Sequence, residues 1–252
     1  MLPCPSQIAD ALPAVGLDRA AALQDRLDRK YLVGVDVLEA LIARLHGSHA
    51  VLEVGGRRAF AYETTYFDTP ELSAFRDHVQ QRRRRFKCRS REYVDSGLCT
   101  FEVKLKGPRG RTVKHRMPYE REQRDRVSAP ALAFLRECVE GAYGRSPDEA
   151  LAPSLVATCT RLTLVGAGER VTCDFDLRFG APDGRGGRLA DGTVIVETKS
   201  ARGDAVADRL PRRLGVRPEA VCSKYCLGVG LTNPDARRNT LLPLLRRHFE
   251  AT

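Results

Sequence analysis

Alternating charge is the feature that most constrains this sequence, and it is concentrated between Arg82 and Lys114. The three pieces of this block read RRRRFKCRSREY, LCTFEVKLKG and GRTVKHR. Because strand side chains point alternately to opposite faces, each piece is predicted to be a strand with one charged face. The charged faces would carry Lys87, Arg89 and Arg91, then Glu102, Lys104 and Lys106, then Lys114 and Arg116, and the apolar faces Phe86, Cys88, Phe101, Val103 and Leu105. Such a sheet is either solvated on its charged face or built around a cavity that holds polyanions.

The charge of the whole chain indicates an anionic partner. Its 252 residues include 42 Lys and Arg against 32 Asp and Glu, for a net charge of +10. This excess favours a phosphate compound, a nucleic acid or a membrane surface as partner. The chain has no Trp and few aromatic residues on which bases could stack, so no nucleic acid is expected. No stretch approaches the roughly 18 apolar residues of a membrane span, and the N-terminus lacks a signal-peptide pattern, so a cytoplasmic location is expected.

The remaining segments predict an α+β fold. Helical spacing of apolar residues covers 34–47, 128–144 and much of the chain from 205 onward, and a short helix is expected to end at 78. Strand patterns occur at 26–33, 61–68, 154–166, 169–180 and 192–200, besides the three described above. About seven or eight strands, mostly joined by hairpins, favour an antiparallel sheet. Residues 1–25 are predicted to be a lead-in, 26–252 a single domain, and the Gly-rich stretch 181–192 a flexible connection.

Glu-x-Lys occurs on two of the predicted strands, as Glu102 with Lys104 and as Glu197 with Lys199. The pattern places an anion beside a cation on one strand face. A carboxylate that holds a divalent metal next to an ammonium that holds phosphate needs this arrangement. A solvent-facing ion pair has the same pattern, so both interpretations stay open.

Two further pairs bear on the same question. Arg89 and Arg91 lie two residues apart, so their planar guanidinium groups could bind one phosphate chain from the same face. Asp174 and Asp176 are spaced in the same way and are either metal ligands or partners of internal salt bridges. We find no Gly-rich phosphate loop and no cysteine spacing of the kind that binds zinc.

A series of motifs, taken in order, resembles the polyphosphate polymerase domain of the vacuolar transporter chaperone (VTC) family in its bacterial form. The motifs are DRLDRKYLV, YETTYFDTPELSAFRDH, KCRSREY, FEVKLKG, GRTVKHR, TRLTL, RVTCDFDL, VIVETKS and CSKYCLGV, which span about residues 26–228. This family belongs to the triphosphate tunnel metalloenzymes. The resemblance implies an antiparallel β-barrel tunnel of about eight strands with a charged interior and with helices packed outside.

The resemblance also assigns site residues by position. The catalytic cations would be Lys30, Arg89, Arg91, Lys104, Lys114, Arg161 and Arg170. Further phosphate contacts would come from Arg116, Lys199 and Lys224. Glu197 matches the metal-holding carboxylate of the family, and Glu102 is expected as a second acid.

The implied activity is a metal-dependent polyphosphate polymerase that moves the γ-phosphoryl group of ATP onto a growing polyphosphate chain, helped by Mn²⁺ or Mg²⁺. Its partners would be ATP and polyphosphate or pyrophosphate. Phosphoryl transfer depends on positioning and charge neutralisation, which a set of Arg and Lys side chains with one metal can supply. Two alternatives stay open. One is a triphosphate hydrolase of the same fold, in which water replaces the phosphate acceptor, and the other is a non-catalytic module that binds polyphosphate or RNA. The oligomeric state is not indicated by the sequence.

Overall fold

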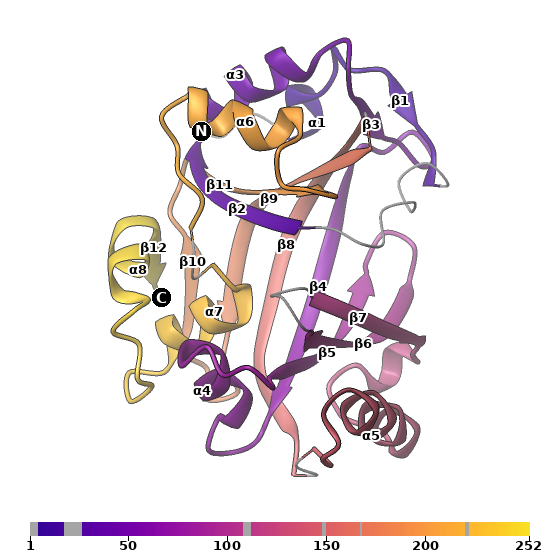
Figure 1. Cartoon of the computed structure of the whole chain (residues 1–252), viewed down its shortest axis with the longest axis vertical. Helices are drawn as coiled ribbons and strands as arrows, with labels where there is room; N and C mark the ends of the chain where they lie inside the picture. The colour runs from indigo at the N-terminus through magenta and orange to yellow at the C-terminus, as the bar shows by residue number, and fades with distance from the viewer. Residues whose placement is uncertain (1–4, 18–26, 108–111, 148–149, 167, 220–221) are drawn as a thin grey trace. The chain divides into compact units, whose positions relative to one another are not determined.

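The computed structural model describes residues 5–17, 27–107, 112–147, 150–166, 168–219 and 222–252 (Figure 1). Residues 1–4 and 18–25 of the predicted lead-in, and residue 26, lie outside this range. The strands are β1 (Ala14–Val15), β2 (Leu27–Gly34), β3 (Ala50–Leu52), β4 (Ala59–Asp68), β5 (Phe86–Tyr93), β6 (Leu98–Lys106), β7 (Thr112–Pro118), β8 (Ala152–Gly166), β9 (Glu169–Gly180), β10 (Gly186–Leu189), β11 (Thr193–Ser200) and β12 (Phe249–Ala251). The helices are α1 (Pro5–Ile8), α3 (Val35–Leu45), α4 (Ser73–Val79), η2 (Arg121–Gln123), α5 (Ala129–Tyr143), α6 (Val206–Arg213), α7 (Lys224–Thr232) and α8 (Leu242–His248).

The predicted α+β class with a mainly antiparallel sheet is confirmed. The hydrogen-bonded order of the main path is β12-β10-β9-β8-β4-β5-β6-β7, and β11 joins β2 to β9. Among the described strands this path has two ends, β12 and β7, and it does not close into a barrel. No helix in the described part of the chain is long and apolar enough to cross a membrane.

The chain divides into two compact units that alternate along the sequence. Unit 1 comprises residues 1–61, 159–177 and 189–222, and unit 2 comprises residues 62–158, 178–188 and 223–252. Strands β4, β8, β9 and β10 contribute residues to both units. The prediction of one domain over 26–252 stays a prediction, and each unit is described by itself below.

In unit 2 the apolar face of the charge-alternating strands packs on α5. Phe67, Cys88, Phe101, Val103 and Leu105 form a buried cluster with side chains of that helix. Figure 1 shows α5 beside β6, in agreement with the contacts between the two elements. Gly144 caps the C-terminal end of the helix and has the left-handed conformation that glycine favours (φ 64°). The helix therefore covers one face of this sheet and leaves the charged residues on the other.

The sheet of unit 1 also has one apolar face and one polar face. Tyr31 and Val33 of β2, Val194 and Val196 of β11 and Cys173 of β9 are buried together with apolar residues of α3 and α6. Their sequence neighbours, which include Lys30, Glu197 and Thr172, point to the other face because strand side chains alternate. Apolar alternation thus determines which residues of each unit can form a polar site.

The Gly-rich stretch predicted to be flexible contains the short strand β10, and this prediction was wrong at residues 186–189. A Cβ atom at Gly187 would lie 2.2 Å from a methyl group of Leu231. A larger residue at this position would force the Leu231 side chain to move, because the strand passes so close to α7. Composition suggested mobility here, whereas close packing explains the glycine.

Candidate functional site

Three lysines lie side by side on the charged face of unit 2. In the antiparallel register, Lys87 is opposite Lys104 on β6, and Lys104 is opposite Lys114 on β7. The next row on the same face is Arg89, Glu102 and Arg116. Like charges directly opposite one another destabilise a sheet unless counter-charges are nearby. The register thus brings five predicted site residues together, with Lys87 as an addition that the predicted site residues did not include.

Glu102 is the counter-charge at the centre of this face. Its side chain is fully buried (0% exposed), and its Oε2 lies 2.7 Å from Nε and 2.6 Å from NH2 of Arg89. Its Oε1 forms an ion pair with Lys114. Burial would raise the pKa of Glu102, but the nearby cations, led by Arg89 and Arg91, lower it well below its usual value. Glu102 is therefore a carboxylate held in its charged form by an excess of positive charge.

Arg91 makes few contacts with other protein groups on this face. It is only 7% exposed. Its Nε donates to Thr64 Oγ1 at 3.3 Å, and its guanidinium carbon lies 5.3 Å from the centre of the Tyr62 ring. No other hydrogen bond or ion pair to Arg91 is found within the described ranges, so four of its five N–H groups lack a protein acceptor. A nearly buried guanidinium with so many unused donors suits an anionic ligand.

The lysines of this face differ in how strongly they are held. Lys114 is 31% exposed. The pKa of Lys114 is lowered to about 8, mainly by burial and with a contribution from Arg89, although Glu102 acts in the opposite direction. Lys87 Nζ donates to Ser223 Oγ at 2.9 Å. Ser223 precedes α7, whose first residue is the predicted phosphate contact Lys224.

Unit 1 carries a second polar face, formed by β2, β11 and β9. One cross-strand row is Lys30, Glu197 and Thr172, and the next is Asp28, Lys199 and Arg170. Lys199 Nζ lies 2.9 Å from Glu197 Oε2 and donates to Thr172 Oγ1 at 2.9 Å, and Lys30 Nζ donates to the Cys222 carbonyl at 2.7 Å. Burial lowers the pKa of Lys199 to about 8, with Arg161 contributing, whereas Glu197 opposes the shift. The second Glu-x-Lys pair is thus a partly buried ion pair.

Arg161 on β8 holds Asp174 in the same unit. Its Nε lies 2.6 Å from Asp174 Oδ1 and its NH2 2.8 Å from Oδ2, a bidentate pair. Asp174 is buried, whereas Asp176 is exposed and has a positive φ of 50°. Of the two interpretations left open for these aspartates, the structure favours the internal salt bridge for Asp174.

The structure contains no preformed carboxylate cage for a metal in its described residues, where no group of three or more His, Cys, Asp and Glu is suitably placed. Such a cage is not required when phosphate oxygens complete the coordination, because Mg²⁺ is often held by one or two carboxylates together with substrate phosphates. Glu197 fits this role as a single carboxylate. Glu102 has both oxygens in ion pairs, and its predicted metal contact stays a prediction.

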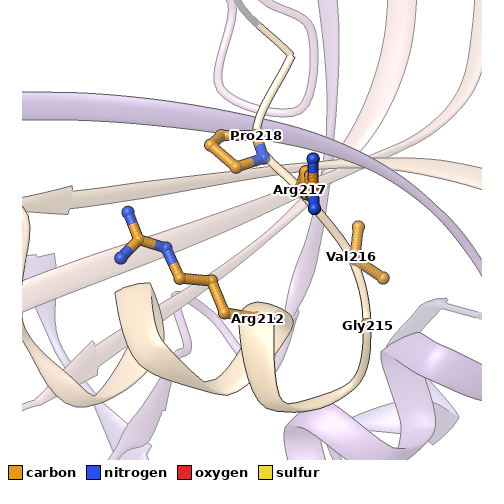
Figure 2. Close-up of a pocket in the computed structure, with 5 residues that line it drawn as sticks. All are labelled: Arg212, Gly215, Val216, Arg217 and Pro218. Carbon is orange, nitrogen blue, oxygen red and sulfur yellow. The ribbon is translucent and has the colours of Figure 1, made fainter.

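A cavity of about 570 Å³ occurs elsewhere in unit 1 (Figure 2). It is lined by Arg212, Gly215, Val216, Arg217 and Pro218, and Figure 2 shows the two arginine side chains extending from the end of α6 and the segment after it. These five lining residues include none of the predicted site residues. Apart from Lys224 on α7, the predicted site residues lie on strands of the two units.

The sequence matches the family model described as the VTC domain over residues 25–233. The chain belongs to the VTC domain family. The resemblance drawn from the motifs is thereby confirmed, and the VTC domain includes every predicted site residue. No curated protein matches the sequence.

Solved structures similar to this chain include two bacterial proteins and one plant protein. A "putative adenylate cyclase" from Bacillus halodurans is 15% identical, with a TM-score of 0.53, over 80% of this chain and 95% of its own. Another from Vibrio parahaemolyticus is 16% identical, with a TM-score of 0.47, over 81% and 98%. A "putative adenylyl cyclase" from Hippeastrum, described as having a dominant triphosphatase activity, is 13% identical, with a TM-score of 0.47, over 81% and 95%. The likeness to the Bacillus halodurans protein concerns the fold of the VTC domain and not its reaction.

Proposed function

We propose that this VTC domain is a metal-dependent polyphosphate polymerase that uses ATP. The observation that carries the proposal is the burial of two arginines in unit 2: Arg89 and Arg91 are each only 7% exposed. They lie on a face where one acid, Glu102, is surrounded by four cations that lower its pKa. The positive charge in excess needs a polyanion, and phosphate oxygens are suitable acceptors for the arginine donors that lack protein partners.

The proposed reaction depends on neutralising the negative charge of the phosphates. A terminal oxygen of the polyphosphate chain would form a bond to the γ-phosphorus of ATP, the bond from that phosphorus to the β–γ bridging oxygen would break, and ADP would leave. The negative charge spread over the transferred group is stabilised by fixed cations that need no rearrangement during the reaction. We assign the phosphate chain to Arg89, Arg91 and Lys114, and the transferring phosphoryl group to Lys30 and Lys104.

The remaining assignments concern the supporting contacts. Arg161 and Arg170 are proposed as further phosphate-binding cations, together with Arg116, Lys199 and Lys224. Glu197 would hold Mn²⁺ or Mg²⁺ jointly with substrate oxygens, and the ion would neutralise phosphate charge. For Glu102 the ion pairs with Arg89 and Lys114 favour a role as counter-charge.

The test is a polymerisation assay with purified protein, ATP and Mn²⁺. We expect a ladder of chains that exopolyphosphatase degrades and that resist ordinary phosphatase. Release of orthophosphate from ATP or tripolyphosphate without a ladder would replace the polymerase with a triphosphate hydrolase. Binding of tripolyphosphate without either reaction would identify a binding module.

A matched pair of variants locates the activity. Arg91→Ala should lower turnover by about 100-fold, since it removes a charge-assisted phosphate contact from a nearly buried site. Arg83→Ala removes the same charge from an exposed position and should leave turnover within about twofold of wild type. Equal activity of the two variants would show that the charged face of unit 2 is not the site.

A further inference from the structure

Two motifs that support the family assignment, YFD at 66–68 and SKY at 223–225, have no role in the proposed reaction apart from Lys224. Both lie in unit 2. Tyr66 on β4 is directly opposite Arg89 on β5, and both side chains are buried. The sheet register therefore places a tyrosine beside a proposed phosphate-binding arginine.

The Arg89 guanidinium is held from two sides. Its Nε and NH2 bind Glu102, and its NH1 donates to the Tyr66 hydroxyl at 3.1 Å. These contacts use three of its five N–H groups. No further acceptor for Arg89 is found among the residues that the structure describes. The two remaining donors belong to NH1 and NH2, which can bind phosphate as a fork only if the guanidinium plane is fixed.

Tyr66 is itself fixed by a second layer of contacts. Its ring centre lies 5.1 Å from that of Tyr225, and Ser154 Oγ donates to the Tyr66 carbonyl at 3.1 Å. The Tyr225 hydroxyl donates to Asp68. Burial and the Asp68 charge raise the pKa of Tyr225 well above its usual value, so this hydroxyl keeps its proton. Residues of the two family motifs thus hold the Tyr66 ring in place, and the Tyr66 hydroxyl accepts a hydrogen bond from Arg89.

We propose that Tyr66 is a positioning residue that orients Arg89, together with Glu102, so that the two free N–H groups of Arg89 bind one phosphate of the chain. The inference rests on the proposed function for its ligand. It assigns no catalytic role to Tyr66, which acts through Arg89.

Calorimetric titration with tripolyphosphate tests the inference independently of turnover. Tyr66→Phe removes the hydroxyl and keeps the ring, and it should weaken tripolyphosphate binding by about tenfold, as expected for a lost hydrogen bond to a charged group. Tyr93→Phe is the matched control, since Tyr93 lies on β5 two residues after Arg91 and contacts Tyr62. It should change the affinity by less than about twofold.

A double-mutant comparison separates a positioning role of Tyr66 from a general loss of structure. In an Arg89→Lys protein the planar fork is absent, so adding Tyr66→Phe should weaken binding by less than about twofold. Tyr225→Phe is a second variant that leaves the Tyr66–Arg89 contact in place, and it should weaken binding by about threefold. Thermal unfolding without ligand checks that each variant is folded.

The outcomes distinguish this inference from the proposed function. An unchanged affinity in Tyr66→Phe, or an equal loss in both backgrounds, would overturn the role of Tyr66 while the polymerase stands. A wild-type protein that binds tripolyphosphate but makes no ladder would overturn the polymerase and leave the positioning role intact. No tripolyphosphate binding by wild type would overturn both.

Discussion

Glu102 is a buried carboxylate whose partners are the cations of a proposed ligand site. Glu102→Gln would remove its charge at nearly constant size and leave Arg89 uncompensated in a buried position. We expect the free energy of unfolding to fall by about 3 kcal/mol, as is typical when a buried ion pair loses one partner. Urea unfolding measures the change.

Tripolyphosphate offers an internal check on that prediction, because a bound anion can replace the missing charge. It should stabilise Glu102→Gln against urea more than it stabilises wild type. The control is Glu63→Gln, which breaks a partly exposed pair with Arg124 and should lower the free energy of unfolding by less than about 1 kcal/mol. A similar loss in both variants would contradict the special position of Glu102.

Lys199, a proposed phosphate contact of unit 1, predicts a defined pH dependence. Its pKa is lowered to about 8 from an ordinary value of 10.5, so the unfolded chain binds this proton more tightly than the folded protein. The contribution of Lys199 therefore makes the free energy of unfolding rise as the pH increases from about 8 to 10.5. Tripolyphosphate affinity should instead fall above about pH 8, since Lys199 loses its charge. Titrations at pH 7 and pH 9 test this, and Lys199→Arg, which stays charged, should show a smaller fall.

At the scale of elements, Asp68 stabilises the start of α4, whose N-cap residue makes no side-chain capping hydrogen bond. α4 begins after Leu72, which has a positive φ of 56° and makes no side-chain cap. Asp68 Oδ1 accepts from the Ala74 amide at 2.9 Å and Oδ2 from the Phe75 amide at 2.9 Å. Asp68→Ala should lower the free energy of unfolding by about 3 kcal/mol, through several lost buried hydrogen bonds. The exposed Asp235→Ala is the control, and equal unfolding midpoints in urea would contradict this role.

The strands show which parts of the site could be predicted from sequence. Period-two alternation identified the charged faces of β5, β6 and β7, because burial on α5 allows only one face to be apolar. The register could not be predicted, since a shift of two residues preserves every face and changes every cross-strand neighbour. The row of Lys87, Lys104 and Lys114 and the pairing of Tyr66 with Arg89 depend on that register. A tyrosine on a strand also gives no signal of its own, because tyrosine is common in strands that only pack.

At the scale of the whole molecule, the net charge of +10 attracts anions before any contact forms. Arg82, Arg83 and Arg84 are exposed and contribute to this field. Replacing all three with Ala should lower the association rate of tripolyphosphate by about threefold and leave the dissociation rate unchanged. Stopped-flow measurements at low salt test this. The difference in association rate from wild type should vanish at about 0.5 M NaCl, where screening is nearly complete. A changed dissociation rate would contradict the prediction and indicate that these arginines contact the bound anion.

The row of three lysines has a practical consequence for handling the protein. Small divalent anions would be attracted to neighbouring lysines, so phosphate and sulfate in a buffer are expected to compete with tripolyphosphate for this face. An affinity measured in such a buffer would be weaker than one measured in a zwitterionic buffer with chloride. By the same competition, free orthophosphate should inhibit the proposed polymerase reaction.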